Sequence, residues 1–183
     1  VCTPTTSTTL QGSAVAFPAV GTWGCVSGTG TISDPNAPNA TLSGLSVGQV
    51  VLRWTVDNGP CANGTTFDDV VINIFDGTAP VALAGDDQAF CTPIAQTVTM
   101  FASSPIFPAV GTWTLLSGAA VIASPNDPFT AISDLALGEN VFAWTIDNGA
   151  CGSSSDEVSI AVFDHTVPPA DAGDDQEFCQ DVN

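Results

Sequence analysis

The chain contains the same sequence twice, and this duplication constrains its fold more than any other feature. Residues 17–61 align without gaps on residues 107–151, with 23 identities in 45 positions. Residues 68–91 align on residues 156–179, with 15 identities in 24 positions. The period of about 88–90 residues is too long for a solenoid unit and matches the size of a small sandwich domain. The duplication therefore predicts two domains of one fold.

The hydrophobic pattern within each repeat is typical of β-strands. Val50, Leu52, Trp54 and Val56 alternate with other residues, and the pattern is repeated by Asn140, Phe142, Trp144 and Ile146. Trp54 and Trp144 are therefore predicted to face the core. An Asp-Asn-Gly turn follows at residues 57–59, and a second alternating run over residues 70–74 should complete a hairpin. Further strands are predicted at residues 8–14, 21–26, 40–45, 81–84, 97–102, 111–116, 130–135 and 158–162. Six or seven short strands in a repeat predict an all-β fold of tandem immunoglobulin-like β-sandwich domains.

The placement of one short motif predicts the domain boundaries. Ala-Gly-Asp-Asp-Gln occurs at residues 84–88, early in the second repeat, and recurs at residues 172–176. We expect a first repeat over residues 1–78 that lacks its N-terminal strand, a second over residues 79–167, and the first strand of a third over residues 168–183. The chain then reads as a window from a longer array. The alternative is that its C-terminal strand completes the first repeat of a neighbouring subunit, as in strand donation.

The charge of the chain excludes several classes of partner. It has one Arg or Lys in total, 19 acidic residues and a formal net charge of −18. Such a surface repels nucleic-acid phosphates and anionic membranes. No apolar run reaches the roughly 18 residues that span a bilayer, so direct membrane insertion is not expected. The 44% hydrophobic content supplies material for a core.

Repeated cysteines indicate an oxidising, extracellular setting. Cys2, Cys91 and Cys179 occupy equivalent positions, and Cys61 and Cys151 each follow an Asp-Asn-Gly turn. If the last hairpin loop lies at the same end of a sandwich as its N-terminus, the expected disulfides are Cys2–Cys61 and Cys91–Cys151. The competing pairing is Cys61–Cys91 with Cys151–Cys179. The extra Cys25 replaces Leu115 and is predicted to be a small buried apolar residue.

No constellation for catalysis is evident. The sequence has no Tyr, and its one histidine, His165, falls in a linker where the first repeat has Gly77. A catalytic triad requires a histidine between a nucleophile and an acid. The absence of paired Cys-x-x-Cys motifs argues against zinc. We therefore expect that the chain is not an enzyme.

Two ligand classes remain as hypotheses. Calcium prefers carboxylate and carbonyl oxygens on loops. The candidate calcium ligands are Asp57, Asp68 and Asp69 near one end of a repeat, and Asp76, Asp86 and Asp87 near the junction. The rival interpretation is that these aspartates cap turns. Carbohydrate binding requires exposed aromatic faces, for which Phe17 and Phe107 are the candidates.

The combined motifs resemble a known family of repeats. They are Ala-Gly-Asp-Asp-Gln followed by Cys, Gly-Thr-Trp, Pro-Asn-x-Pro, a Trp-Thr strand and Asp-Asn-Gly-x-Cys. This string resembles the PKD-like, immunoglobulin-like tandem repeats of large Bacteroidota cell-surface proteins, including gliding-motility adhesins. The resemblance covers essentially the whole chain.

The resemblance implies PKD-like β-sandwiches, export by the type IX route and a cell-surface stalk or adhesin function. The expected partners are neighbouring repeats of the same chain or fibre, with surface glycans at a distal region.

Overall fold

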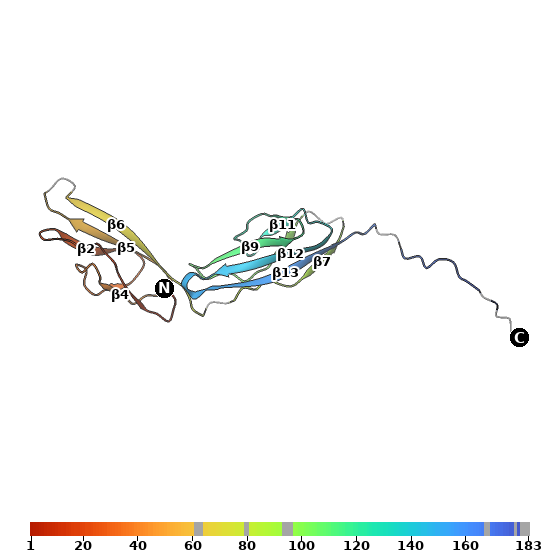
Figure 1. Ribbon diagram of the computed structural model, residues 1–183, viewed down its shortest axis with the longest axis horizontal. Coiled ribbons are helices and arrows are strands. Elements are labelled where there is room, and N and C mark those ends of the chain that lie inside the picture. The colour runs from red at the N-terminus through yellow and green to blue at the C-terminus, as the bar shows by residue number, and fades with distance from the viewer. Residues whose placement is uncertain (61–63, 79–80, 93–96, 167–168, 178, 180–183) are drawn as a thin grey trace.

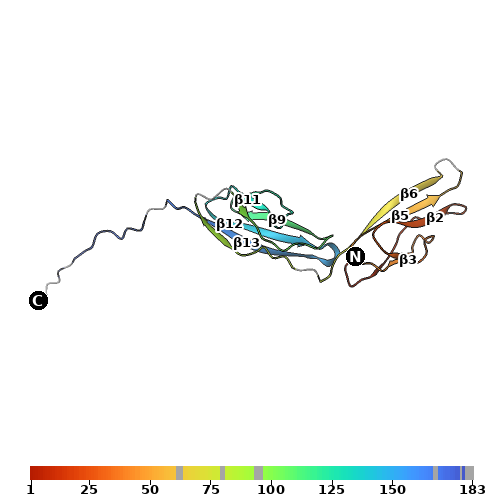
Figure 2. The same ribbon diagram turned by 180° about the vertical axis from the view of Figure 1, so that it is seen from behind.

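The chain folds into two β-sandwiches that lie end to end, with residues 169–177 extending away from the second (Figure 1). A computed structural model describes all residues except 61–63, 79–80, 93–96, 167–168, 178 and 180–183. The view from behind shows the same elongated arrangement (Figure 2). The two units correspond to the two sequence repeats, here called repeat one and repeat two.

Repeat one consists of two three-stranded sheets. One has the order β1-β4-β3 and the other has the order β2-β5-β6. The strands are β1 (Ser7–Thr9), β2 (Val20–Ser27), β3 (Thr31–Ile32), β4 (Thr41–Ser43), β5 (Gly48–Asp57) and β6 (Thr65–Ile74).

Repeat two has the same sheets with one more strand. The order is β10-β11-β8 in one sheet and β7-β13-β12-β9 in the other. The elements are β7 (Gln88–Cys91), β8 (Val98–Thr99), β9 (Val110–Ser117), β10 (Val121–Ile122), β11 (Ala131–Ser133), β12 (Gly138–Asp147), the 3₁₀ turn η1 (Gly149–Cys151) and β13 (Ser153–Phe163). The predicted all-β fold of tandem immunoglobulin-like sandwiches is confirmed. Within the described residues, no helix is long and apolar enough to cross a membrane.

The long strands form the predicted hairpins. β5 pairs antiparallel with β6 over the whole length of both strands, and β12 pairs antiparallel with residues 153–162 of β13. Asp57 accepts a hydrogen bond from the Gly59 N–H at 2.8 Å, and Asp147 accepts one from Gly149 at 2.9 Å. Both glycines have positive φ, 65° and 51°, which favours glycine at this position. The Asp-Asn-Gly sequence therefore builds the same turn in both repeats.

Each core is centred on a pair of tryptophans, as the alternation predicted. Trp23 and Trp54 are buried in repeat one with ring centroids 4.9 Å apart. Trp113 and Trp144 are buried in repeat two with ring centroids 5.1 Å apart. Each pair joins the two strands that carry it, because Trp23 lies opposite Trp54 and Trp113 lies opposite Trp144 in the antiparallel register. Two separate cores follow, one for each repeat.

The predicted strand at residues 81–84 is wrong, because this segment is extended but joins no ladder. Side chains bind it instead: Ser154 Oγ accepts from the Ala82 N–H and Asp156 Oδ2 accepts from the Ala84 N–H, both at 2.8 Å. The first strand of repeat two is β7, which pairs in parallel with β13. Residues 169–177, predicted to begin a strand, also carry none.

Candidate functional site

A disulfide bond joins the two repeats. Cys2, at the start of repeat one, is bonded to Cys151 at the tip of the β12–β13 hairpin, with 5.3 Å between the Cα atoms. The predicted pairs Cys2–Cys61 and Cys91–Cys151 are therefore wrong, and so is the alternative pairing of Cys151 with Cys179. Cys91 and Cys179 are exposed free thiols, whereas Cys61 lies outside the described residues.

The correction follows from the position of Cys2 along the sandwich. Cys2 forms a parallel bridge with Phe75, just beyond the end of β6, and its counterpart Cys91 pairs with Phe163 at the end of β13. Since β6 and β13 run away from their hairpin turns, both cysteines lie at the end opposite their own hairpin. The segment before Cys91, residues 81–90, first runs along the sandwich. The prediction placed Cys91 at the same end of the sandwich as the hairpin, which is wrong because residues 81–90 run to the opposite end before Cys91 is reached.

Contacts between the repeats surround the disulfide. The Asn148 side chain donates a hydrogen bond to the backbone carbonyl of Asp76 at 2.8 Å. The Phe75 ring lies against Gly149, where any Cβ would collide with the ring. The hairpin tip of repeat two is thus packed on the C-terminal end of repeat one. Sequence analysis missed Phe75 and Asn148, although both recur in the other repeat as Phe163 and Asn58.

Hydrogen bonds fix the beginning of the linker after repeat one. Asp76 Oδ1 accepts from both the backbone N–H and the hydroxyl of Thr78, each at 2.8 Å. These bonds hold the pKa of the Asp76 carboxyl below its usual range. Thr3 Oγ1 accepts from the Gly77 N–H at 2.8 Å. The linker therefore leaves repeat one in a defined direction.

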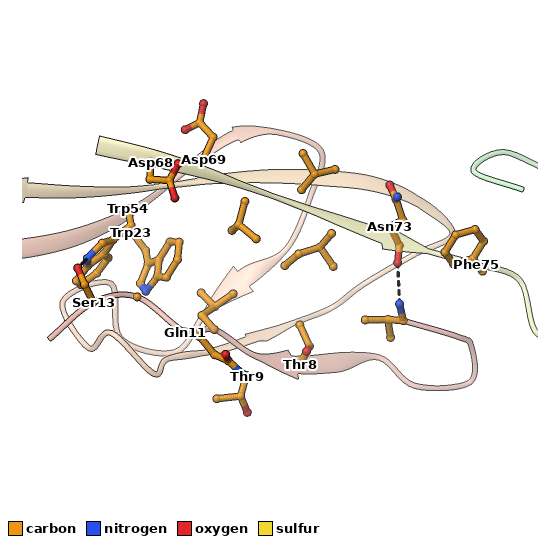
Figure 3. A pocket seen from close by; sticks show the side chains of 16 residues that line it. Thr8, Thr9, Gln11, Ser13, Trp23, Trp54, Asp68, Asp69, Asn73 and Phe75 are labelled. Carbon is orange, nitrogen blue, oxygen red and sulfur yellow. Dashed lines mark hydrogen bonds between the residues drawn. The ribbon is translucent and has the colours of Figure 1, made fainter. Parts of the chain in front are cut away.

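Repeat one contains an open groove of about 820 Å³ between its two sheets (Figure 3). Residues 8–13 line one side and residues 68–73 line the other. Trp23 and Trp54 lie at one end and Phe75 lies at the other (Figure 3). The groove thus exposes the edge of β6 and reaches the core.

In repeat two, residues 81–87 fill the corresponding space. Leu83 exchanges hydrogen bonds with Ser103, the counterpart of Ser13, at 2.9 and 3.0 Å. On the other side, the Ser159 N–H donates to Asp87 Oδ1 at 2.8 Å. The alternating residues Ala82 and Ala84 are buried beneath this segment. It therefore closes the gap between the two sheets.

The exposure of equivalent residues on β6 and β13 shows the effect of this segment. Val158 on β13 is 1% exposed, whereas its counterpart Val70 on β6 is 38% exposed. Asp156 binds the Ala84 N–H, whereas its counterpart Asp68 lines the groove. The groove in repeat one therefore lies where residues 81–87 lie in repeat two, and it is lined by Asp68 and Ser13, the counterparts of Asp156 and Ser103.

The six candidate calcium ligands are dispersed among different contacts. Asp57 and Asp76 bind turn N–H groups, Asp87 binds Ser159, Asp68 lines the groove and Asp86 lines a shallow hollow in repeat two. Among the described residues, no group of three His, Cys, Asp or Glu side chains is arranged to hold a metal. The calcium hypothesis stays a prediction: a melting temperature that rises with millimolar Ca²⁺ and falls with chelator would support it.

The sixth candidate, Asp69, forms an ion pair. Arg53 Nε and Nη2 donate to its two carboxylate oxygens at 2.7 and 2.9 Å. The hydrogen bonds from Arg53 hold the pKa of Asp69 below its usual range. The Arg53 guanidinium also lies 3.9 Å from the centroid of the Phe67 ring. Asp69 is thus part of the surface of the β5–β6 sheet.

The aromatic residues divide between core and surface. All four tryptophans are core residues, while Phe17 is 96% exposed and Phe107 is 64% exposed, as the carbohydrate hypothesis requires. Phe101 and Phe129 form an exposed edge-to-face pair, with ring centroids 6.3 Å apart. Carbohydrate binding stays a prediction that rests on these exposed rings.

Cys25 is exposed, so the prediction of a buried residue is wrong. It lies beside the irregularity in the β2–β5 register, and its thiol points toward the carbonyls of Ser27 and Gly28. Its counterpart Leu115 packs against the core of repeat two. The shorter cysteine side chain does not make this contact.

Comparisons with solved structures find similar folds. The PKD domain from KIAA 1837 protein is 20% identical, with 49% of this chain and 92% of that chain covered and a TM-score of 0.41. The PKD domain from human KIAA0319 is also 20% identical, with coverages of 50% and 88% and a TM-score of 0.41. Immunoglobulin domains 1–4 of Sidekick-1 are 12% identical, with coverages of 88% and 45% and a TM-score of 0.42.

No protein-family model and no curated protein matches the sequence. The sheet pairing described above is that of tandem immunoglobulin-like, PKD-like β-sandwiches, as predicted.

Proposed function

We propose that the chain is a structural, non-catalytic segment of an extracellular surface adhesin or filament. In this function, disulfide-stapled sandwiches in series form a stalk that presents a distal adhesive region. The observation that carries the proposal is the Cys2–Cys151 bond, which joins successive repeats end to end instead of closing each repeat on itself. The high negative charge favours the same function, since it keeps long chains soluble and apart.

The resemblance of the repeat motifs supports a more specific version. In that version the parent is a gliding-motility-like adhesin of a Bacteroidota cell surface, exported by the type IX route. The parent protein, released from its native surface without reductant, should then be a single very long chain that forms a thin, beaded filament. A parent of about this chain's own mass would contradict the stalk.

The stapled junction gives a direct test of the stalk proposal. The variant Cys2→Ser/Cys151→Ser should keep both sandwiches folded, because each has its own core. Its repeats should nevertheless reorient over a wider range of angles, since only the noncovalent contacts of Asn148 and Phe75 remain between them. Small-angle X-ray scattering should therefore give a broader distribution of dimensions than for the oxidised chain. Cys25→Ser is the matched control, because Cys25 forms no disulfide. Identical distributions for all three proteins would overturn the proposal.

The groove favours a second candidate function, a fibre subunit that polymerises by strand donation. Residues 172–176 repeat the sequence of residues 84–88, and residues 170–177 are exposed and bonded to no strand. The tail of one subunit would then occupy the groove of the next, as residues 81–87 occupy that space in repeat two. This exchange would complete the sandwich of repeat one through a second copy.

A substitution in the tail distinguishes the two functions. Ala172 is exposed, but its counterpart Ala84 is 2% exposed in repeat two. Ala172→Arg should therefore abolish self-association if donation occurs. Asp171→Arg is the control, since its counterpart Leu83 is 57% exposed and tolerates a long side chain. Sedimentation showing polymers of the wild type and of Asp171→Arg, but not of Ala172→Arg, supports donation. A wild-type chain that stays monomeric at high concentration contradicts it.

A further inference from the structure

The far end of repeat two presents the same structure that the junction uses at the end of repeat one. Cys91 pairs in parallel with Phe163, as Cys2 does with Phe75. Thr92 N–H donates to the Phe163 carbonyl at 2.8 Å, as Thr3 N–H does to Phe75 at 3.0 Å. The backbone that carries the bonded cysteine therefore has a matched copy at Cys91.

The linker that follows is also held in the same way at both ends. Asp164 Oδ1 accepts from the Thr166 N–H and hydroxyl at 2.8 and 2.7 Å, which reproduces the Asp76–Thr78 turn. His165 N–H donates to Thr92 Oγ1 at 3.2 Å, as Gly77 does to Thr3. The His165 ring, absent in repeat one, also hydrogen-bonds Thr92 Oγ1 at 2.9 Å. The chain thus leaves both repeats by the same turn.

The two ends differ in what covers them. The hairpin tip of repeat two covers Phe75 and takes Cys2 into a disulfide. Phe163 is 58% exposed, and Cys91 is an exposed thiol. The Cys91 end of repeat two therefore has counterparts of the three groups that repeat one uses at the junction: the ring of Phe163, the carbonyl of Asp164 and the thiol of Cys91. No hairpin covers them among the described residues.

We propose that the Cys91 end of repeat two is a docking surface for the Asp-Asn-Gly-x-Cys hairpin of the next repeat in the same chain, sealed by a disulfide from Cys91 to that hairpin's cysteine. The proposal deepens the stalk function and rests on it. The presence of Cys91 alone would not indicate a docking site. The supporting observation is that the equivalent cysteine, Cys2, is bonded to Cys151 in the same molecule. In the next repeat, the asparagine would donate to the Asp164 carbonyl, and the glycine would leave room for Phe163.

The sequence after repeat two argues for a repeat of the same chain as the occupant. Residues 172–176 reproduce residues 84–88, the segment that leads into repeat two after the first junction. Both segments follow the same Asp-x-Thr turn. A repeat that begins with residues 172–176 would bring its hairpin to Cys91 as repeat two brings its own to Cys2.

Formation of this bond is a balanced oxidation. The two thiols lose two protons and two electrons as the S–S bond forms, and a disulfide oxidant such as oxidised glutathione is reduced to two thiols. An exporting cell would supply an oxidant of the same class outside the cytoplasm.

The test uses the chain extended by one repeat, in which residues 1–179 are followed by a second copy of residues 92–167. After equilibration with oxidised and reduced glutathione, peptide mapping by mass spectrometry should find Cys91 bonded to the hairpin cysteine of the added repeat. It should also find Cys2 bonded to Cys151. In the matched control, the added hairpin cysteine is replaced by serine, and Cys91 should stay open to alkylation while Cys2–Cys151 persists.

The outcomes separate this inference from the proposed function. If Cys2–Cys151 forms and Cys91 stays alkylatable in the extended chain, the inference is wrong and the stalk proposal stands. If Cys2–Cys151 itself fails to form, the stalk proposal loses its main support and the inference falls with it. A bond from Cys91 to Cys61 of a second copy, seen as a covalent dimer, would overturn the assignment to the same chain.

A substitution that leaves every cysteine in place tests the docking surface itself. Phe163→Ala should reduce the equilibrium constant for the Cys91 disulfide by about tenfold, since burial of the ring stabilises the docked hairpin. Phe101→Ala is the control, because Phe101 is 63% exposed and lies on another part of repeat two. Equal disulfide formation in both variants would exclude Phe163 from the surface and overturn the proposed docking.

Discussion

Asn140 is a buried polar residue at a position where the strand pattern calls for an apolar one. Its side chain donates to the Ala136 carbonyl at 2.9 Å and the Ile160 carbonyl at 3.3 Å, and its Oδ1 accepts from the Ala119 N–H at 3.1 Å. Repeat one has Val50 at the same position. Asn140 thus ties two loops of repeat two to β12, a function that alternation alone does not predict.

We expect Asn140→Val to destabilise repeat two by about 1–3 kcal/mol, because it leaves buried backbone groups without partners. Guanidinium unfolding followed by tryptophan fluorescence measures this loss, with the transition of repeat one as the internal reference. An unchanged midpoint for repeat two would mean that water replaces the amide.

The Arg53–Asp69 pair predicts a dependence on pH. Because the folded state lowers the pKa of Asp69, the pair stabilises repeat one above the unfolded pKa of about 3.9, and this contribution is lost as pH falls through the folded pKa. Asp69→Asn should therefore lower the urea midpoint of repeat one slightly at pH 7, and the difference from the wild type should vanish at an acidic pH below the folded pKa of Asp69. The effect is small because both side chains are solvent-exposed.

Glu157→Gln is the matched control for this experiment. Glu157 occupies the equivalent position in repeat two, where its cross-strand neighbour is Ala143 instead of an arginine. It should leave the midpoint of repeat two unchanged at both pH values. A pH-independent difference for Asp69→Asn would show that the ion pair is not its source.

At the residue scale, the sequence predicted the tryptophans well and the cysteine pairs poorly. Alternation alone places Trp54 and Trp144 on the inner face of a strand. Disulfide pairing depends instead on which end of the sandwich a cysteine occupies. That position is decided by the course of residues 81–90, whose extended path along β13 is held by side chains such as Asp156 and leaves no periodic signal.

At the scale of the elements, strand β2 packs closely against the core at one glycine and not at another. A Cβ on Gly21 would collide with the Trp54 ring, whereas a Cβ on Gly24 would meet nothing within 4 Å. Repeat two keeps the first glycine as Gly111, beneath Trp144, and replaces the second by Thr114. The close approach of strand and ring explains the difference.

Two alanine substitutions on β2 should therefore have opposite effects. Gly21→Ala should destabilise repeat one by about 1–3 kcal/mol, because the tryptophan must shift. Gly24→Ala should stabilise it by up to about 1 kcal/mol, because alanine loses less conformational entropy in a strand. Thermal unfolding of the two variants measures both changes. A stabilising Gly21→Ala would mean that the ring moves at little cost.

The hairpins were predictable because period-two alternation and an Asp-Asn-Gly turn are local signals. The groove was not, because it depends on the path of residues 81–87 in repeat two, which is held by side chains such as Asp156 and leaves no periodic signal. Val70 and Val158 are the same residue at equivalent positions, so only their exposed fractions in the structure reveal the groove.

At the scale of the whole molecule, the 88–90-residue period predicted two units, and the structure places them end to end. The contacts between the units were beyond the sequence. They depend on which loop of repeat two meets the end of repeat one, and Phe75 and Asn148 resemble ordinary hairpin and strand-end residues until the junction is seen.

The Cys2–Cys151 bond has a mechanical consequence. Tension applied to the two ends of the chain passes from Cys2 straight to Cys151, so the 149 residues of sequence separation between them carry none of it. At roughly 3.4 Å per extended residue, about 500 Å of contour length cannot be extended while the disulfide is intact. In single-molecule stretching, the oxidised chain should therefore extend about 500 Å less than the reduced chain before its backbone is taut. Equal extensions would mean that the bond does not span the repeats. While the bond is intact, most of the protein therefore bears no load, and the tension is carried by a short covalent path that does not extend.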